Sequence, residues 1–146
     1  MAQTGVSVDP YRNYNFMIEI DGIAQGNFSE CTGLDATTES IEYREGGNNL
    51  TVRKIPGKTT YGDITLKWGL TDSHELWDWR KQTIQGTIVR KNGSIVVYDP
   101  ANAKEVARWN FVRGWPAKWD GPHFDAKGKD IALETLTIAH EGIDRA

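Results

Sequence analysis

The stretch SIEYREGGNNLTVRKIPGKTTYGDITLKWG, residues 40–69, decides how this chain can fold. Its middle part, residues 44–61, is polar, charged and rich in glycine. It lies between two segments, 39–44 and 63–68, that read as β-strands. A connection of this length inside a compact domain is uncommon and is usually functional or engaged with a partner. We therefore interpret residues 44–61 as an arm that packs outside its own domain. The stretch 40–69 also carries apolar residues that a flexible linker would not need: Ile41, Tyr43, Leu50, Val52 and Ile55.

The sequence before the arm predicts a β-hairpin. Residues 14–21 alternate apolar and polar side chains, Asp21-Gly22 is a tight-turn dipeptide, and residues 23–31 return as a second strand. At the far end of the arm, Pro56-Gly57 predicts a turn that leads back into the sheet.

Beyond the arm, Asn92-Gly93 is the strongest hairpin signal in the chain. We expect it to join two strands, residues 87–91 and 94–98. Three further segments read as an alternating strand, an ordered connection and a long final strand: residues 106–113, 114–127 and 131–141.

One segment predicts a helix. Asp72 and Glu75 have the spacing of a capping box, in which the first residue caps the helix and the second reaches back to it. At 100° per residue, an aromatic side emerges that we expect to pack on the sheet. It consists of Leu76, Trp77, Trp79, Arg80, Thr83 and Ile84.

These elements predict a mainly β fold, an antiparallel β-sandwich or barrel of about eight strands with one short α-helix and a long extended arm. We expect a single domain over residues 1–146, with residues 1–12 as an N-terminal extension and residues 44–61 as an assembly arm. An open sheet must hide or use its outer strands.

Composition narrows the function classes. The 146 residues carry a net charge of −3, which does not suit the basic surface that nucleic-acid backbones require, so we expect no specific nucleic-acid binding. Cys31 is the only cysteine, which fits folding in a reducing compartment. The first residues do not resemble a secretory signal, and no apolar run reaches the ~20 residues that span a bilayer. We therefore expect synthesis in the cytoplasm without a signal peptide or a membrane anchor.

Catalytic and metal-binding motifs are weak. His74, His123 and His140 have no spacing that specifies a metal, and Cys31 has no evident base beside it. The glycines of the arm lack the context of a phosphate-binding loop. We expect no enzyme activity, no metal and no cofactor.

The six tryptophans leave one alternative open, a monomeric β-sandwich that binds carbohydrate through exposed indole rings. Trp68, Trp77, Trp79 and Trp109 lie on apolar faces of their predicted elements. Trp115 and Trp119 are the residues that could form such a platform.

Seven segments, taken in order, give the chain a resemblance to a known family. They are FMIEIDG from Phe16, FSECTGL from Phe28, IEYREGGNN from Ile41, RKIPG from Arg53, ITLKWG from Ile64, WPAKWDGP from Trp115 and HEG from His140. This order and spacing closely resembles the inner-tube proteins of contractile phage tails, in the branch found in phage-like extracellular injection systems. The type VI secretion tube protein is related to the same family.

The resemblance implies a structural subunit. Such proteins form hexameric rings around a lumen, and the rings stack into a rigid tube that a contracting sheath drives through a target envelope. The implied partners are other copies of the chain, the sheath protein, baseplate or spike and tube-terminating proteins, and a cargo in the lumen.

Residues of the arm are the expected contacts between subunits. The mixed charges of the arm suit pairing between subunits, and Gly46 and Gly47 are expected to adopt backbone conformations closed to other residues. The predicted interface consists of Arg44, Glu45, Gly46, Gly47, Asn48, Asn49, Leu50, Val52, Arg53, Lys54, Ile55, Pro56 and Gly57.

Overall fold

The computed structural model describes residues 15–23, 28–44, 46, 51–99, 101, 103–128 and 131–146. These residues form nine strands and one helix, in agreement with the predicted mainly β fold. In chain order the elements are β1 (Asn15–Ile20), β2 (Glu30–Thr32), β3 (Ala36–Tyr43), β4 (Arg53–Tyr61), β5 (Ile64–Gly69), α1 (Glu75–Ile84), β6 (Lys91–Asp99), β7 (Lys104–Asp120), β8 (Leu133–Ala139) and β9 (Gly142–Arg145).

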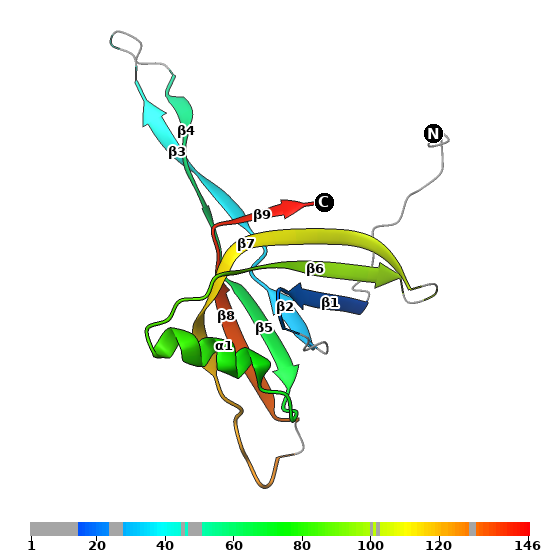
Figure 1. Cartoon of the computed structure of the whole chain (residues 1–146). Coiled ribbons are helices and arrows are strands. Elements are labelled where there is room, and N and C mark those ends of the chain that lie inside the picture. Colours follow the sequence, from blue (N-terminus) through cyan, green and yellow to red (C-terminus); the bar gives the residue numbers. More distant parts are fainter. Residues whose placement is uncertain are drawn as a thin grey trace.

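Seven of the strands form one antiparallel sheet in the order β1-β6-β7-β8-β5-β2, with β9 also paired to β7. Strand β7 is the spine of this sheet, because its first part pairs with β6 and β9 and its last part pairs with β8 (Figure 1). Among the described residues, β1, β2 and β9 each pair on one side only, and the sheet does not close into a barrel. The remaining strands, β3 and β4, pair only with each other.

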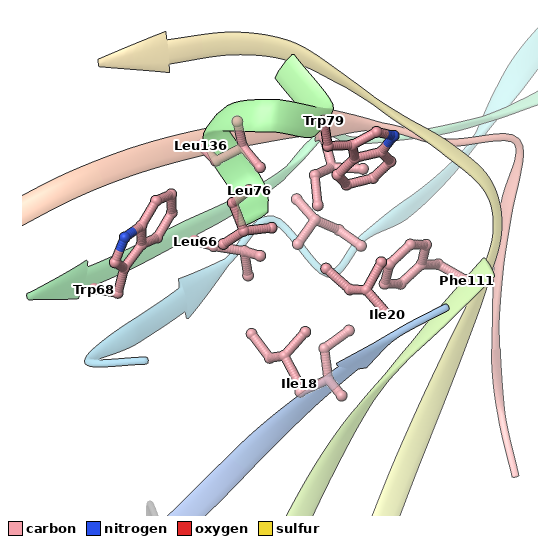
Figure 2. Close-up of a cluster of buried hydrophobic side chains, with 11 residues drawn as sticks. Ile18, Ile20, Leu66, Trp68, Leu76, Trp79, Phe111 and Leu136 are labelled. Carbon is pink, nitrogen blue, oxygen red and sulfur yellow. The ribbon is translucent and has the colours of Figure 1, made fainter. Parts of the chain in front are cut away.

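The core lies between α1 and one face of the main sheet (Figure 2). Leu76 and Trp79 enter it from the helix, and Ile64, Leu66 and Trp68 from β5. Buried indole N–H groups have acceptors there: Nε1 of Trp79 donates to the Val89 carbonyl oxygen at 2.7 Å, and Nε1 of Trp68 donates to Oε2 of Glu134 at 2.9 Å. Burial of large aromatic side chains is a main source of stability in a core of this kind.

The turn predicted at Asp21-Gly22 is confirmed. Gly22 has a φ of 75°, and the Ile23 amide donates to the Ile20 carbonyl oxygen at 3.0 Å. The hairpin predicted around this turn is wrong, because the second strand does not pair with the first beyond the isolated bridge of Ile20 and Ile23: β1 pairs with β6, and β2, which begins at Glu30, pairs with β5.

The hairpin predicted at Asn92-Gly93 is wrong, because both residues lie inside β6. Gly93 is needed there for close packing. A Cβ atom at Gly93 would overlap the ring of Phe111 and lie 2.7 Å from the Glu19 carbonyl oxygen. The turn predicted at Pro56-Gly57 is wrong for a similar reason: both residues lie in β4, where Gly57 leaves room for the side chain of Ile41.

Two further boundaries differ from the prediction. Residues 114–120 continue β7 and are not a connection, since they pair with β8 after a bend at Arg113, whose φ is 52°. The final strand is divided at His140 into β8 and β9, which pair with different parts of β7.

The predicted helix cap is also wrong. Helix α1 begins at Glu75 with His74 at the N-cap position, and no side chain caps it there. The packing side is narrower than predicted. Leu76 and Trp79 are buried and Trp77 packs on Trp119, but Ile84 at the end of the helix is 59% exposed.

Candidate assembly surfaces

The hairpin of β3 and β4 projects away from the body of the molecule (Figure 1). The arm, which we define as residues 36–61, therefore starts earlier than the predicted 44–61 and is a two-stranded ribbon along much of its length. All of β3 and most of β4 are exposed to solvent. A two-stranded ribbon in water is marginally stable by itself. Burial of its exposed apolar side chains against another surface would therefore stabilise the ribbon.

The two faces of the arm differ in polarity. Ile41 pairs with Ile55 and Tyr43 pairs with Arg53, and paired residues lie on the same face of a ribbon. Ile41, Tyr43 and Ile55 are 46%, 48% and 44% exposed, and we call these three residues the arm face.

The opposite face of the arm is polar. It carries the cross-strand pair Glu42 and Lys54, and a hydrogen bond of 2.9 Å between the hydroxyl groups of Thr38 and Thr59. The polar face of the arm is therefore compatible with exposure to water, whereas the arm face exposes apolar side chains.

The base of the arm is tied to the body at Gly62. Its amide donates to Oδ1 of Asp35 at 2.7 Å, and its carbonyl oxygen lies 2.9 Å from Nε2 of His140. The imidazole also contacts the ring of Tyr61, with ring centroids 5.8 Å apart. These contacts set the direction in which the arm leaves the sheet.

The structure brings part of the predicted interface together. Five of the predicted residues lie in β4, and the first four of them pair with β3: Arg53, Lys54, Ile55, Pro56 and Gly57. Arg44 and Val52 are exposed near the end of the ribbon. Gly46 has no positive φ and has open space around it, so the expected special backbone conformation is wrong there. The other predicted residues lie outside the described part of the chain: Glu45, Gly47, Asn48, Asn49 and Leu50.

Exposed apolar side chains also lie where β5 ends and β8 begins, at the end of the molecule opposite the arm (Figure 1). Leu70, Ile131 and Leu133 are 51%, 79% and 39% exposed. Leu133 pairs with Gly69, and a Cβ atom at Gly69 would lie 3.9 Å from Cγ2 of Ile131, so Ile131 and Leu133 share one face there. The sequence predicted that Ile131 and Leu133 belong to the long final strand, but it did not predict that both side chains are exposed among the described residues.

The histidines do not form a metal site. Nδ1 of His74 lies 2.9 Å from Asp78 on the exposed side of α1, and both ring nitrogens of His140 face backbone carbonyl oxygens. Within the described ranges, no group of three His, Cys, Asp or Glu side chains could hold an ion.

Cys31 is not placed as a nucleophile. Burial raises the pKa of its thiol to about 11, because the thiolate loses solvation in the apolar surroundings. The reactive form is therefore scarce at neutral pH.

Trp115 and Trp119 do not form the exposed platform that the carbohydrate-binding alternative requires. Trp119 packs against the core and against Trp77, with ring centroids 4.7 Å apart, and Trp115 is only partly exposed within β7. Among the described residues, no helix has the length and apolar character to cross a membrane.

Comparison with known families gives one match over most of the chain. The model of the family described as T4-like virus tail tube protein gp19 matches residues 12–144. No match is found among curated protein sequences.

Solved structures with a similar fold come from contractile machines. A chain in the cryo-EM structure of the sheath/tube terminator of an extracellular contractile injection system, PVC, is 28% identical, with a TM-score of 0.85 over 97% of this chain and 99% of that chain. A chain of the PVC sheath-tube complex in the extended state is 27% identical, with a TM-score of 0.84 over 94% of this chain and 91% of that chain. A type six secretion system protein shares the fold, at 10% identity and a TM-score of 0.60 over 90% of this chain and 82% of that chain.

Proposed function

Since the chain belongs to the T4-like virus tail tube protein gp19 family, we propose that it forms hexameric rings that stack into the inner tube of a contractile, phage-tail-like injection system. The family is a structural one, so the chain is a tail tube protein and not an enzyme. The observation that carries the assembly proposal is the arm, whose apolar face has no covering element among the described residues.

Ring closure is supported by the edges of the sheet. Strands β1 and β2 lie at opposite ends of the strand order, each with one unpaired edge, and an unpaired edge is a ready template for another strand. When an edge of one copy pairs with the other edge of the next, the contact is head-to-tail and closes into a ring if the rotation permits. Six copies would then form a continuous barrel around a lumen.

Stacking requires a second, different contact, which we assign to the arm. Of the predicted interface, residues 53–57 belong to β4, which pairs with β3 and with no strand of the main sheet among the described residues. The arm can therefore reach another ring while the sheet edges join neighbours within a ring.

The other proposed partners are further proteins of the contractile, phage-tail-like particle. The similar solved chains come from a sheath-tube complex and a sheath/tube terminator, and further matches include the baseplate of the anti-feeding prophage. We infer that this chain contacts a contractile sheath, a baseplate or spike protein and a tube terminator, and that its lumen holds the delivered cargo. Synthesis and assembly in the cytoplasm belong to the same proposal.

Negative-stain electron microscopy of the purified full chain tests this function. The expected result is rings with sixfold symmetry, and tubes of stacked rings at higher protein concentration. Mass measurement in solution should give six copies for the smallest ring. A protein that remains monomeric at every concentration would contradict the proposal.

A further inference from the structure

We propose that the corner of β7, which consists of Val112, Arg113 and Gly114, sets the angle between β1 and β2 and thereby fixes how many copies close one ring. This inference rests on the proposed function, in which β1 of one copy pairs with β2 of the next. It assigns control of the ring to three residues that lie on neither of the two pairing strands.

The corner joins two parts of the main sheet. Strands β6 and β9 pair with the part of β7 that ends at the corner, and β8 pairs with β7 from Trp115 onward. Strand β1 is connected to β7 through β6, and β2 is connected to it through β5 and β8 (Figure 1). Of the described strands, β7 is the one that belongs to both parts. The direction of β1 relative to β2 therefore depends on the conformation of β7 at the corner.

The backbone of the corner has an unusual conformation. Between the pairs Gly93–Phe111 and Lys91–Gly114, β6 has one residue and β7 has two, which is the arrangement of a β-bulge. A bulge bends its strand and increases the local twist. Within this bulge Arg113 has a φ of 52°, in the left-handed region that residues with a side chain rarely adopt. The bend is therefore a specific local conformation and not a gradual curvature of β7.

Two neighbouring segments hold the corner in this conformation. The Arg113 amide donates to Oδ1 of Asn92 at 3.0 Å, which satisfies a backbone group that the bulge takes out of the strand ladder. On the other side, the Glu141 amide donates to the Val112 carbonyl oxygen at 3.0 Å, and Oε2 of Glu141 lies 2.6 Å from Nε of Arg113. The corner is consequently held from β6 and from the segment between β8 and β9.

Gly114 allows close packing between the two parts of the sheet. A Cβ atom at Gly114 would lie 2.9 Å from Cε2 of Phe111 and 3.0 Å from Cγ2 of Ile138. Phe111 precedes the corner in β7, and Ile138 belongs to β8. Because a larger residue would push these side chains apart, packing fixes the angle together with the backbone.

A small change of this angle is enough to change the ring. In a closed ring, each copy is rotated from the last by a full turn divided by the number of copies, which is about 60° for six copies and about 51° for seven. A change of φ at one residue from the left-handed to the extended region turns the chain by more than this difference. Uniform rings therefore require a corner with one conformation.

Substitution of Asn92 by alanine tests the corner. The Asn92 side chain is exposed, so the variant Asn92→Ala should fold, but the Arg113 amide loses its acceptor. Native mass spectrometry should show that the single ring mass of the wild-type chain is lost, with new species heavier or lighter by one subunit. The matched control is Asn92→Asp, which keeps a side-chain oxygen at this position and should give the wild-type ring mass alone.

A second pair of variants tests the backbone of Arg113 itself. Arg113→Val and Arg113→Asn both remove the ion pair with Glu141, but valine opposes the left-handed conformation and asparagine tolerates it. We expect mixed ring masses from Arg113→Val and one ring mass from Arg113→Asn. Circular dichroism checks that each variant is folded, and the two Asn92 variants decide the question if Arg113→Val does not fold.

The outcomes separate this inference from the proposed function. If the wild-type chain forms no rings, the proposed function fails. If the wild-type chain forms rings and Asn92→Ala gives the same single ring mass, the corner does not set the ring size, although the ring itself is right. Mixed masses from Asn92→Asp and Arg113→Asn as well would also overturn the inference, because the held backbone conformation would then not be the determinant. Folded monomers alone from Asn92→Ala would contradict it too, since the corner would then control the pairing of β1 with β2 and not its angle.

Discussion

Nε2 of His140 lies 2.9 Å from the carbonyl oxygen of Gly62, which joins the corner between β8 and β9 to the base of the arm. Nδ1 of the same ring lies 3.1 Å from the carbonyl oxygen of Gly142. A neutral imidazole has one N–H group, so it can donate to only one of these carbonyls at a time. The ring of His140 therefore lies between the arm base and the start of β9, and it donates a hydrogen bond to one of the two at a time.

Replacement of His140 by alanine should loosen the arm without unfolding the sheet. The partly buried Gly62 carbonyl loses its nearby ring nitrogen, which costs about 1–2 kcal/mol of unfolding free energy. Urea denaturation measures this loss, and electron microscopy should show shorter tubes because the arm no longer leaves at a fixed angle. Replacement of His74, whose ring contacts only Asp78 on the exposed side of α1, is the control and should change neither measurement. Tubes of normal length from His140→Ala would refute the positioning role.

Replacement of Gly93 by alanine should destabilise the fold. The new Cβ atom overlaps the Phe111 ring, which is 1% exposed, and forcing extra volume into a packed core costs about 1–3 kcal/mol. Thermal unfolding should show a lower midpoint for this variant. Gly46→Ala is the matched control, since a Cβ atom at Gly46 has no neighbour within 4 Å. Equal midpoints for the two variants would show that β6 and β7 separate easily at this point.

Replacement of Ile55 by aspartate should abolish tubes while sparing the monomer. The side chain is 44% exposed in the single chain, so the unfolding free energy should change by less than about 1 kcal/mol. In a tube the carboxylate would be buried in the contact of the arm face. Ser40→Asp adds the same charge to the polar face of the arm and should be tolerated. Tube formation that is equally impaired by both variants would show that the arm is covered on both faces.

The thiol of Cys31 should make stability fall at alkaline pH. Burial raises its pKa from 9.0 to about 11, so above pH 9 the unfolded chain loses this proton while the folded chain keeps it. The unfolded state is therefore favoured progressively as the pH rises from 9 to about 11, and the effect is absent below that window. Urea unfolding of the wild-type chain and of Cys31→Ala should give a constant difference below pH 9. Above pH 9 the wild-type chain should lose stability relative to the variant, and a difference that stays constant up to pH 11 would contradict the burial of this thiol.

Most strands could be predicted because their alternation comes from one buried and one exposed face. Ile18 and Ile20 in β1, and Ile64, Leu66 and Trp68 in β5, alternate for this reason, and all five are buried as expected. The helix could be placed because its apolar and aromatic residues gather on one side at 100° per residue. These patterns are local, and short-range periodicity records them directly.

The turns at Asn92-Gly93 and Pro56-Gly57 could not be judged from local sequence. A glycine serves equally well in a turn and beneath a large side chain, and the residues that lie over Gly93 and Gly57 come from other strands. The helix cap failed in a similar way, since Asp72 has the right spacing but the helix begins later. Each of these outcomes depends on contacts with residues that are distant in the sequence.

The sequence by itself determined a β-rich chain with one helix, an arm with apolar residues, no clustered catalytic motif and a resemblance to tail tube proteins. Only the tertiary structure decided that Ile41, Tyr43 and Ile55 share one face of the arm, because register sets which side chains meet across a ribbon. It also placed Ile131 and Leu133 beside Gly69 at the opposite end, since the pairing of β5 with β8 joins segments about sixty residues apart in the sequence. Sequence patterns show which residues are apolar, and the fold determines which of them remain exposed and available for contact with another copy.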